Sequence, residues 1–325
     1  MKLPRRQFLH LAAGAAALPA VSRTAWAQAY PARPVRMIVG FTPGGGNDIV
    51  ARLIGQWLSV RLGQPFVIEN RPGAGSNIGT QAVVNAPPDG TTLLLCGTTN
   101  AINDTYYPKL SFSFVRDIAP ISSITRQPQV MLAHPLFAAK TLAELIAYAK
   151  ANPGKVNMSS AGVGSIGHLA GELFKMMTGV TMVHVPFGGN SPALTALLGG
   201  QVDVSFASMP SSIEFIRTGK LRGLAVTSTA RSEALPDVPA GAETVPGYEV
   251  SAWYGIGAPK GTPAEIIEKL NKEINAGLAD ATLKARIAEF GGTPMALSPA
   301  EFGKFIADET EKWGKVIRAA NIRQQ

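Results

Sequence analysis

Short apolar segments alternate with amphipathic segments through most of this chain, and this alternation restricts the possible folds more than any other feature. The first block reads as strand 35–41, helix 49–62, strand 66–69, helix 78–85 and strand 91–96. Strands connected through helices pair in parallel, with the helices packed on the faces of the sheet. The sequence therefore predicts an α/β fold with a parallel sheet, in which ligands bind at the carboxyl ends of the strands.

An extended segment at 118–133 interrupts the alternation, which then restarts and is followed by a second extended segment at 248–258. Two such connections in a chain of 325 residues predict two lobes with a hinge between them. We expect lobe 1 to contain residues 28–125 and 250–325, and lobe 2 to contain residues 126–249. The elements expected in lobe 2 are helix 142–151, strand 156–160, helix 166–178, strand 182–186, helix 192–198, strand 202–207, helix 212–218 and strand 221–227.

A glycine-serine turn links strand 156–160 to helix 166–178. The first amides of a helix have no partner within it and carry partial positive charge. Glycines such as Gly162 and Gly164 let a ligand approach the backbone closely. The segment therefore predicts an anion-binding turn. His168 lies in the first helical turn, where it either faces the ligand or is a capping or core-edge residue.

A second turn of this kind, F-T-P-G-G-G-N-D at 41–48, lies between the first strand and the first helix. A glycine-rich turn at 71–77 follows the second strand, and the polar segment 98–100 follows the third. Parallel strands bring such turns to one edge of a sheet. We expect turns 41–48 and 160–168 to hold one ligand from two lobes. The segment 98–100 is either a ligand contact or an ordinary polar turn.

Residues 1–27 have the composition of an export signal rather than of a folded element. Arg5 and Arg6 precede an apolar run at 8–20, and A-W-A at 25–27 is typical of a processing site. The apolar run is shorter than the roughly 20 residues of a membrane span. We expect the signal to be cleaved, and the paired arginines resemble a twin-arginine signal.

Charge and cysteine content exclude several classes of partner. Cleavage after residue 27 removes four basic residues, so the net charge of +8 falls by four to +4, and no lysine- or arginine-rich run remains. We therefore expect neither a nucleic-acid partner nor a membrane-surface role. Cys96 is the single cysteine of the chain, which excludes an intramolecular disulfide, and its apolar neighbours predict a buried side chain.

Several enzymatic interpretations fail on local sequence. Residues 162–167 fit G-x-G-x-x-G, but the segment 182–190 lacks the acidic residue that a dinucleotide ribose requires. The turn at 43–48 lacks the lysine of a nucleotide-triphosphate loop, and Ser165 is not part of a G-x-S-x-G motif. We expect no cofactor and no metal. No metal-binding spacing surrounds the histidines that follow the signal, which are His134, His168 and His184.

The cleft that remains offers backbone amides, hydroxyls and side-chain amides with little fixed positive charge. Such a site suits carboxylates, because each helix start can hold one carboxyl group and water can fill the gaps. A competing interpretation is an exported α/β enzyme that uses Ser165 and His168.

Five short motifs carry a resemblance to a known family. They are F-x-P-G-G-x-x-D at 41–48, P-G-A-G at 72–75, S-A-G-x-G-S-x-G-H-L at 160–169, P-A-L at 192–194 and G-G-Q-V-D at 199–203. Each motif alone is weak, but together they are specific. The chain resembles the Bug-type extracytoplasmic solute receptors, the periplasmic binding proteins of tripartite tricarboxylate transporters, over essentially the whole mature length.

The resemblance implies a two-lobed type II periplasmic binding fold, in which each lobe is a sheet flanked by helices and the ligand cleft lies between the lobes. It implies a monomeric, non-enzymatic protein of the periplasm. Such a receptor captures a small organic carboxylate and delivers it to the membrane permease subunits of a transporter. A receptor that signals to a membrane sensor is the alternative within this class.

The resemblance also implies where the ligand binds. One carboxylate is expected between the first turn and the glycine-serine turn, partly through water. Asp48 is expected to hold its loop rather than touch an anion, since like charges repel, and Asp203 is expected to support the cleft from below. The full set expected at the ligand is Phe41, Gly44, Gly45, Gly46, Asn47, Asp48, Asn77, Thr98, Thr99, Asn100, Ser160, Gly162, Gly164, Ser165, His168, Phe187, Gly188, Asn190 and Asp203.

The chain departs from the family pattern at two places. Gly46 and Asn47 stand where an alanine and a small hydroxyl residue are common. Residues 187–190, F-G-G-N, stand where a tyrosine followed by lysine or arginine is common. Loss of that cation predicts a shift from dicarboxylates toward a monocarboxylate or an aromatic acid. The sequence leaves the identity of the ligand open.

Overall fold

The computed structural model describes residues 30–107 and 109–319. The expected export signal, residues 1–27, lies outside the described residues. The strands are β1 (Val35–Val39), β2 (Phe66–Asn70), β3 (Thr92–Gly97), β4 (Ile118–Ala133), β5 (Val156–Ser160), β6 (Met182–Pro186), β7 (Val204–Ser208), β8 (Arg222–Val226), β9 (Ser251–Pro259) and β10 (Thr293–Pro294). The helices are α2 (Gly46–Leu62), the 3₁₀ turn η1 (Ala74–Ser76), α3 (Asn77–Val84), α4 (Thr98–Tyr106), α5 (Phe114–Asp117), α6 (Leu142–Ala151), α7 (Ile166–Thr178), α8 (Asn190–Leu198), α9 (Met209–Arg217), α10 (Gly241–Thr244), α11 (Ala264–Ala279), α12 (Ala281–Glu289) and α13 (Pro299–Ala319).

The strands of the described residues form one mixed sheet in the order β2-β1-β3-β9-β4-β7-β5-β6, with β8 and β10 paired to β4. Strands β1, β2 and β3 pair in parallel, and β5 pairs in parallel with β6 and β7. The expectation of a wholly parallel sheet is wrong. Strand β4 carries the chain out of the first half and β9 brings it back, so the two run antiparallel to each other.

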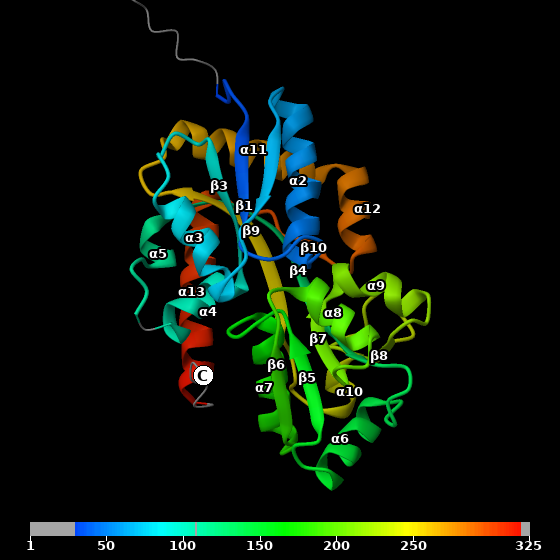
Figure 1. The fold of residues 1–325 in the computed structure, drawn as a ribbon. Coiled ribbons are helices and arrows are strands. Elements are labelled where there is room, and N and C mark those ends of the chain that lie inside the picture. The colour runs from blue at the N-terminus through cyan, green and yellow to red at the C-terminus, as the bar shows by residue number, and fades with distance from the viewer. Residues whose placement is uncertain (1–29, 108, 320–325) are drawn as a thin grey trace, which may run out of the picture.

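Strand β4 belongs to both halves of the molecule. Its residues 118–128 pair with β9, whereas residues 129–133 pair with β7. The described residues therefore form two lobes, each a sheet flanked by helices, and β4 and β9 run between them (Figure 1). One lobe contains β1, β2 and β3 with helices such as α2 and α11, and the other contains β5, β6 and β7 with helices such as α7 and α8 (Figure 1).

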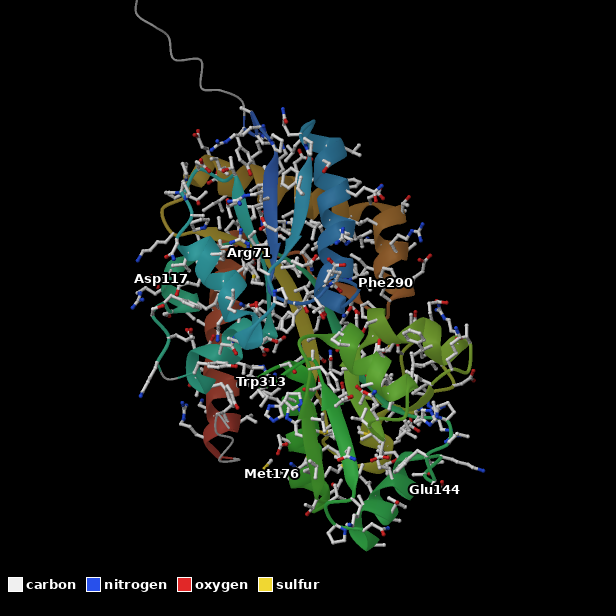
Figure 2. All side chains as sticks on the ribbon, viewed as in Figure 1. Arg71, Asp117, Glu144, Met176, Phe290 and Trp313 are labelled. Carbon is white, nitrogen blue, oxygen red and sulfur yellow. The ribbon has the colours of Figure 1, made fainter. Side chains whose placement is uncertain are left out.

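Helix α7 shows how the sequence sets the local structure next to the lobe interface. Ser165 caps its first turn, because its hydroxyl accepts a hydrogen bond from the His168 amide, and Gly179 ends it with a left-handed φ of 70°. The buried Phe174 packs edge-on against Tyr248 in the core of its lobe. Met176, by contrast, is exposed (Figure 2). Burying a side chain such as Phe174 contributes roughly 1.5–3 kcal/mol.

The polar segment 98–100 is the start of helix α4 rather than a turn, so that alternative is wrong. The Asn100 side chain accepts a hydrogen bond from the Gly97 amide and donates one to Thr80. The Thr98 hydroxyl accepts a hydrogen bond from the amide of Trp253. These polar groups are buried beside the apolar Ala101, Ile102 and Tyr106, so polar residues interrupt the apolar stripe from which sequence patterns identify helices.

Cys96 is buried in β3, as its apolar neighbours predicted, and burial raises the pKa of its thiol. Within residues 30–107 and 109–319, the helices lack the length and apolar character of a membrane span.

Candidate functional site

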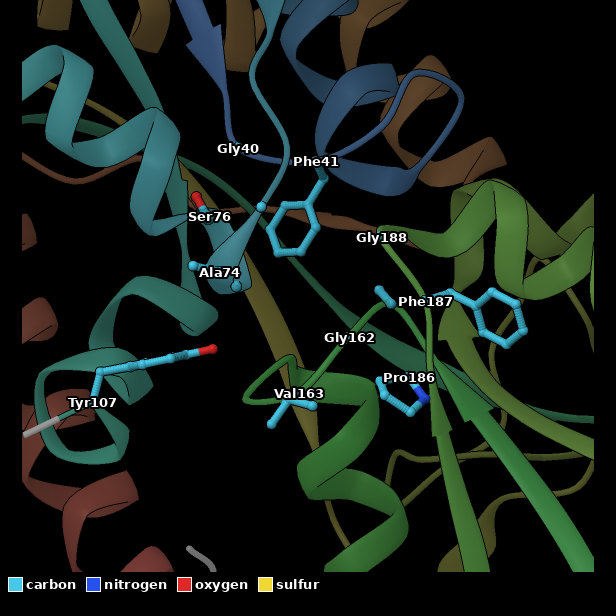
Figure 3. A pocket seen from close by; sticks show the side chains of 13 residues that line it. Gly40, Phe41, Ala74, Ser76, Tyr107, Gly162, Val163, Pro186, Phe187 and Gly188 are labelled. Carbon is cyan, nitrogen blue, oxygen red and sulfur yellow. The ribbon is translucent and has the colours of Figure 1, made fainter. Parts of the chain in front are cut away.

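A cavity of about 240 Å³ lies between the lobes, at the carboxyl ends of β1, β2, β5 and β6 (Figure 3). This is the edge at which open α/β sheets bind ligands. Lobe 1 contributes turns that follow β1 and β2 and one residue at the end of α4, and lobe 2 contributes turns that follow β5 and β6. The lining residues are Gly40, Phe41, Gly73, Ala74, Gly75, Ser76, Tyr107, Ala161, Gly162, Val163, Pro186, Phe187 and Gly188.

The glycine-rich turn after β2 forms one wall in an unusual backbone conformation. Ala74, Gly75 and Ser76 have φ values of 47°, 60° and 78°, so two residues with a Cβ lie in the left-handed region. Such residues are uncommon, and each costs of order 1–3 kcal/mol. Asn103 holds the turn by donating hydrogen bonds to the carbonyl of Gly75 and the side chain of Asn77. The amides of Ala74 and Gly75 have no hydrogen-bond partner among the described residues.

Two aromatic side chains from lobe 1 face the cavity. The ring of Phe41 points into it from the turn after β1, and the hydroxyl of Tyr107 points into it from the end of α4 (Figure 3). Phe41 is 6% exposed, whereas Tyr107 is partly exposed. Burial raises the pKa of Tyr107, so the neutral hydroxyl persists at neutral pH. Lobe 1 thus supplies apolar surface and one phenolic hydroxyl.

The glycine-serine turn after β5 forms the opposite wall, and most of its polar groups are held within the turn. The amide of Gly162 donates to Ser160 Oγ at 3.2 Å, and the amide of Ser165 donates to the carbonyl of Gly162 at 3.1 Å. The amide of Gly164 donates to Nδ1 of His168 at 3.2 Å. The amide of Val163 has no partner among the described residues, and Val163 lines the cavity.

Two stacked histidines support this turn from behind. The rings of His168 and His184 lie 4.1 Å apart at an angle of 17°, and Nε2 of His184 is 2.7 Å from Ser160 Oγ. Burial lowers the pKa of His168 to about 4, and the charge of Lys175 adds to this shift. Burial and nearby charge lower the pKa of His184 to about 3. Both rings are therefore neutral at physiological pH.

Ser165 and His168, the two residues that an enzyme would use here, both form hydrogen bonds within this turn. Ser165 Oγ accepts the His168 amide as a helix cap and donates to Ser160 Oγ at 3.4 Å. Nδ1 of His168 accepts the Gly164 amide, so the proton of the neutral ring lies on Nε2, 3.7 Å from Glu172. The side chains of Ser165 and His168 thus cap and brace the turn, and neither residue lines the cavity.

The first glycine turn holds its loop instead of facing the cavity. The carboxylate of Asp48 accepts hydrogen bonds from the Gly44 amide, from Asn70 and from Arg52, at 2.9 to 3.0 Å. Burial alone would raise the pKa of Asp48, but these donors outweigh it and lower the pKa. The loop-holding role expected for Asp48 matches this geometry. From this part of the chain, Phe41 and its neighbour Gly40 line the cavity.

The lobes touch each other beside the cavity. The hydroxyl of Ser191, at the start of α8, donates a hydrogen bond to the carbonyl of Pro43 at 2.7 Å. A Cβ added to Gly189 would meet Thr42 at 2.0 Å, so only glycine permits this approach of the two loops. The loop that precedes α2 thus packs against the start of α8. Asn190 belongs to the same contact and donates to Ser208 Oγ.

Four of the nineteen residues expected at the ligand line the cavity, namely Phe41, Gly162, Phe187 and Gly188. Phe187 lines it through its backbone, because its ring lies on the far side of the strand from Tyr107 and packs into the core of lobe 2 (Figure 3). Asp203 lies at the opposite end of the strands, where it accepts the amide of Asn157. The structure does not place the following expected residues in the lining: Gly44, Gly45, Gly46, Asn47, Asp48, Asn77, Thr98, Thr99, Asn100, Ser160, Gly164, Ser165, His168, Asn190 and Asp203.

Sequence reasoning missed several lining residues, of which Tyr107 is the most consequential. Its position at the end of α4 has no local signal, because the helix itself was not predicted. The turn at 71–77 was singled out, but Ala74 and Ser76 within it were not. Val163 and Pro186 were missed although each adjoins a predicted residue.

Among the described residues, no group of histidine, cysteine, aspartate or glutamate has the arrangement of a metal site.

Comparisons with known proteins match about nine tenths of this chain. Residues 50–322 match the family described as the tripartite tricarboxylate transporter family receptor. Protein BugT of Bordetella pertussis is 39% identical over 300 residues, which cover 91% of this chain and 92% of BugT. The structure of Rpa4515 of R. palustris with adipate has a TM-score of 0.88 at 36% identity, and covers 90% of this chain and 99% of that one. MatC from Rhodopseudomonas palustris with bound malate has a TM-score of 0.84 at 33% identity, and covers 89% and 100%.

The two-lobed fold and the cavity between the lobes define a periplasmic binding protein. The chain belongs to the receptor family of tripartite tricarboxylate transporters, as its five motifs indicated. Proteins of this family are periplasmic solute receptors, and solved relatives bind the carboxylates adipate and malate.

Proposed function

We propose that this protein is a periplasmic receptor that captures a small organic carboxylate in the cavity between its lobes and delivers it to a tripartite membrane transporter. One observation carries the proposal. The amides of Ala74 and Gly75 in lobe 1 and of Val163 in lobe 2 are unpaired within the described residues, and all three residues line one cavity. Backbone amides without partners are suited to bind an anion.

The relatives support a carboxylate in particular. Rpa4515 was solved with adipate and MatC with malate, and both share the fold over about nine tenths of this chain. A carboxylate has acceptor sites for several amides at once, and such charge-assisted hydrogen bonds are stronger than neutral ones. The ligand therefore joins the two lobes, and binding favours their approach.

The proposed function also implies how the chain divides into two moving bodies. Residues 28–125 with 250–325, and residues 126–249, would act as two bodies that move about β4 and β9. The protein would act as a monomer, since the cavity is completed by the two lobes of one chain. No catalytic role is proposed, because Ser165 and His168 cap and brace their turn.

Calorimetry with acids and their amides tests the proposal. A bound acid at roughly 100 times its dissociation constant should add about 2.7 kcal/mol to the free energy of unfolding. The corresponding primary amide carries no negative charge and should not bind measurably. An amide that binds as tightly as its acid would contradict carboxylate recognition. Transport is tested separately, since deletion of the gene should abolish cellular uptake of the acid.

A further inference from the structure

We propose that two buried, unpaired polar groups at the contacts between the lobes oppose lobe closure, and that they thereby set the affinity for the ligand. The groups are the hydroxyl of Thr42 and the side-chain oxygen of Asn103, both in lobe 1. Each is covered by a glycine of lobe 2 that offers it no hydrogen bond. The two groups act on the lobes, whichever acid the protein binds.

Unpaired polar side chains gather at the boundary between the lobes. Four buried side-chain atoms have no hydrogen-bond partner among the described residues, namely Thr42 Oγ1, Asn77 Nδ2, Asn103 Oδ1 and Gln129 Nε2. Thr42 and Asn103 face lobe 2, and Asn77 is the neighbour that bonds to Asn103. Gln129 lies on β4 at the residue where this strand exchanges β9 for β7. Native interiors contain few such groups, so their gathering at one boundary indicates a cost that is tied to the arrangement of the lobes.

The backbone of Gly189 covers the hydroxyl of Thr42. A Cβ added to Gly189 would lie 2.0 Å from Thr42 Oγ1 and 3.2 Å from the backbone nitrogen of Thr42. Thr42 precedes α2 in lobe 1, whereas Gly189 precedes α8 in lobe 2. Movement of the lobes away from each other would therefore open the hydroxyl to water. Burial of a hydroxyl without a partner is unfavourable, so closure costs free energy here.

The glycine-serine turn covers the side-chain oxygen of Asn103, a residue that is 1% exposed. The orientation of this amide is fixed, because Nδ2 donates to the Gly75 carbonyl at 2.6 Å and to Asn77 Oδ1 at 2.9 Å. Oδ1 therefore faces the turn, where a Cβ added to Gly164 would lie 3.3 Å from it. The Gly164 amide already donates to His168 Nδ1, so the turn dehydrates Oδ1 without donating to it.

The direct contacts that favour closure are weak. The Tyr106 ring packs edge-on against His168 with the ring centroids 6.4 Å apart, and Ser191 donates one hydrogen bond to the Pro43 carbonyl. The net gain of one neutral hydrogen bond is smaller than the cost of leaving a buried group unpaired. A ligand that bonds to the free amides of both lobes supplies the difference. Part of its binding free energy offsets the dehydration of the two groups, which weakens binding and eases release.

Thr42→Val removes one of the two groups, because valine keeps the shape of threonine and replaces Oγ1 with a methyl group. In the ligand-free protein we expect the ratio of closed to open molecules to rise at least about fivefold. A nitroxide on Thr195→Cys reports this ratio, since position 195 is exposed on α8, one turn after the contact that Ser191 makes. In closed molecules the label should broaden the amide resonance of Gly44, and this broadening should increase in Thr42→Val. Cys96 is buried and should not take the label.

Thr310→Val is the matched control for the spin-label measurement. It makes the same change in lobe 1, but the Thr310 hydroxyl is paired, since it donates to the Ile306 carbonyl within α13 at 2.8 Å. It should leave the broadening of Gly44 as it is in the labelled parent protein. Equal broadening in Thr42→Val and the parent, or an equal increase in Thr310→Val, would overturn the inference.

Adipate, the acid in the structure of the relative Rpa4515, tests the effect on affinity. Calorimetry should show at least about fivefold tighter binding to Thr42→Val than to the wild-type protein, because Thr42 does not line the cavity and the substitution adds no ligand contact. Equal or weaker binding would overturn the inference, and if adipate binds neither protein, the spin-label result alone decides. The spin-label measurement uses no acid, so it can fail while carboxylate binding stands, and it can succeed where carboxylate binding fails.

Discussion

The amide of Gly164 donates a hydrogen bond to Nδ1 of His168 across 3.2 Å, so the histidine ring fixes the shape of the turn that faces the cavity. The amide of Gly164 is therefore not available to the ligand. The role of Gly164 is conformational, because its φ of 75° is one that residues with a Cβ rarely adopt. In this turn we therefore expect the ligand to contact the amide of Val163 rather than that of Gly164.

Gly164→Val should abolish ligand binding while the protein still folds. A Cβ on Gly164 would lie 3.2 Å from Tyr106 and 3.3 Å from Asn103, both in lobe 1, so the substitution obstructs the approach of the lobes. The left-handed φ should cost roughly 1–3 kcal/mol of stability. Calorimetry with the cognate acid and urea unfolding measure the two effects.

Gly154→Val is the matched control for this substitution. Gly154 has a φ of 72° in the same lobe, and a Cβ there would meet nothing within 4 Å. It should lose similar stability and keep its affinity. If both variants bind equally well, the turn at 161–165 is only a strand-to-helix connection.

Stability should fall as the pH drops from about 6.5 toward about 4. The folded-state pKa of His168, about 4, lies below its ordinary value of 6.5, so the unfolded chain binds the proton first. This contribution is fully present above the unfolded pKa and is lost as the pH falls. Between about pH 7.5 and about pH 5, His168 should account for about 2 kcal/mol, as measured by urea unfolding.

His168→Asn should remove this part of the pH dependence, because asparagine retains an acceptor for the Gly164 amide but does not titrate. The part that comes from His184, whose pKa is lowered to about 3, should remain. Glu172 and Lys175 also face the ring, so the comparison must be made against the wild-type protein at equal ionic strength. His134→Gln, at a partly exposed histidine outside the cavity lining, serves as the control. A pH profile of His168→Asn identical to that of the wild type would refute the role assigned to the ring.

Asp48→Asn should destabilise lobe 1 by roughly 1–3 kcal/mol, because the new amide cannot accept all the hydrogen bonds that the carboxylate accepts. Asp308→Asn breaks another i,i+4 ion pair, with Lys304, and provides the control. The Asp48 side chain is 4% exposed and that of Asp308 is 62% exposed, so the control should change stability by less than about 1 kcal/mol. Equal losses in thermal unfolding would argue against the loop-holding role.

The lobes should separate in the absence of ligand. The contact between Ser191 and Pro43 joins them in this structure, but one neutral hydrogen bond contributes only about 0.5–1.5 kcal/mol. Small-angle X-ray scattering should therefore show a smaller radius of gyration with saturating acid than without it. An identical radius in both states would favour a rigid binding site.

Helix and strand bounds could be predicted from the sequence where a periodic pattern of apolar residues ends at a glycine-containing turn. Helix 166–178 and strands 156–160 and 182–186 have the predicted bounds, because each has a clear apolar pattern that ends at a turn. The site was predicted less well. Tyr107 reaches the cavity from the end of α4, a helix that was not predicted because buried polar residues interrupt its apolar pattern. The glycine turn at 43–48 packs against the start of α8 and does not line the cavity. Such placements depend on tertiary contacts that no local pattern encodes.

Native mass spectrometry of the protein purified from its own periplasm, without added ligand, tests the central claim most directly. We predict a 1:1 complex with a small organic acid that dissociates on mild activation, and its absence from Gly164→Val prepared in the same way. The released compound should rebind to the emptied protein, whereas its amide should not. A bound compound without a carboxyl group, or chemical turnover of the acid by the purified protein, would contradict the account.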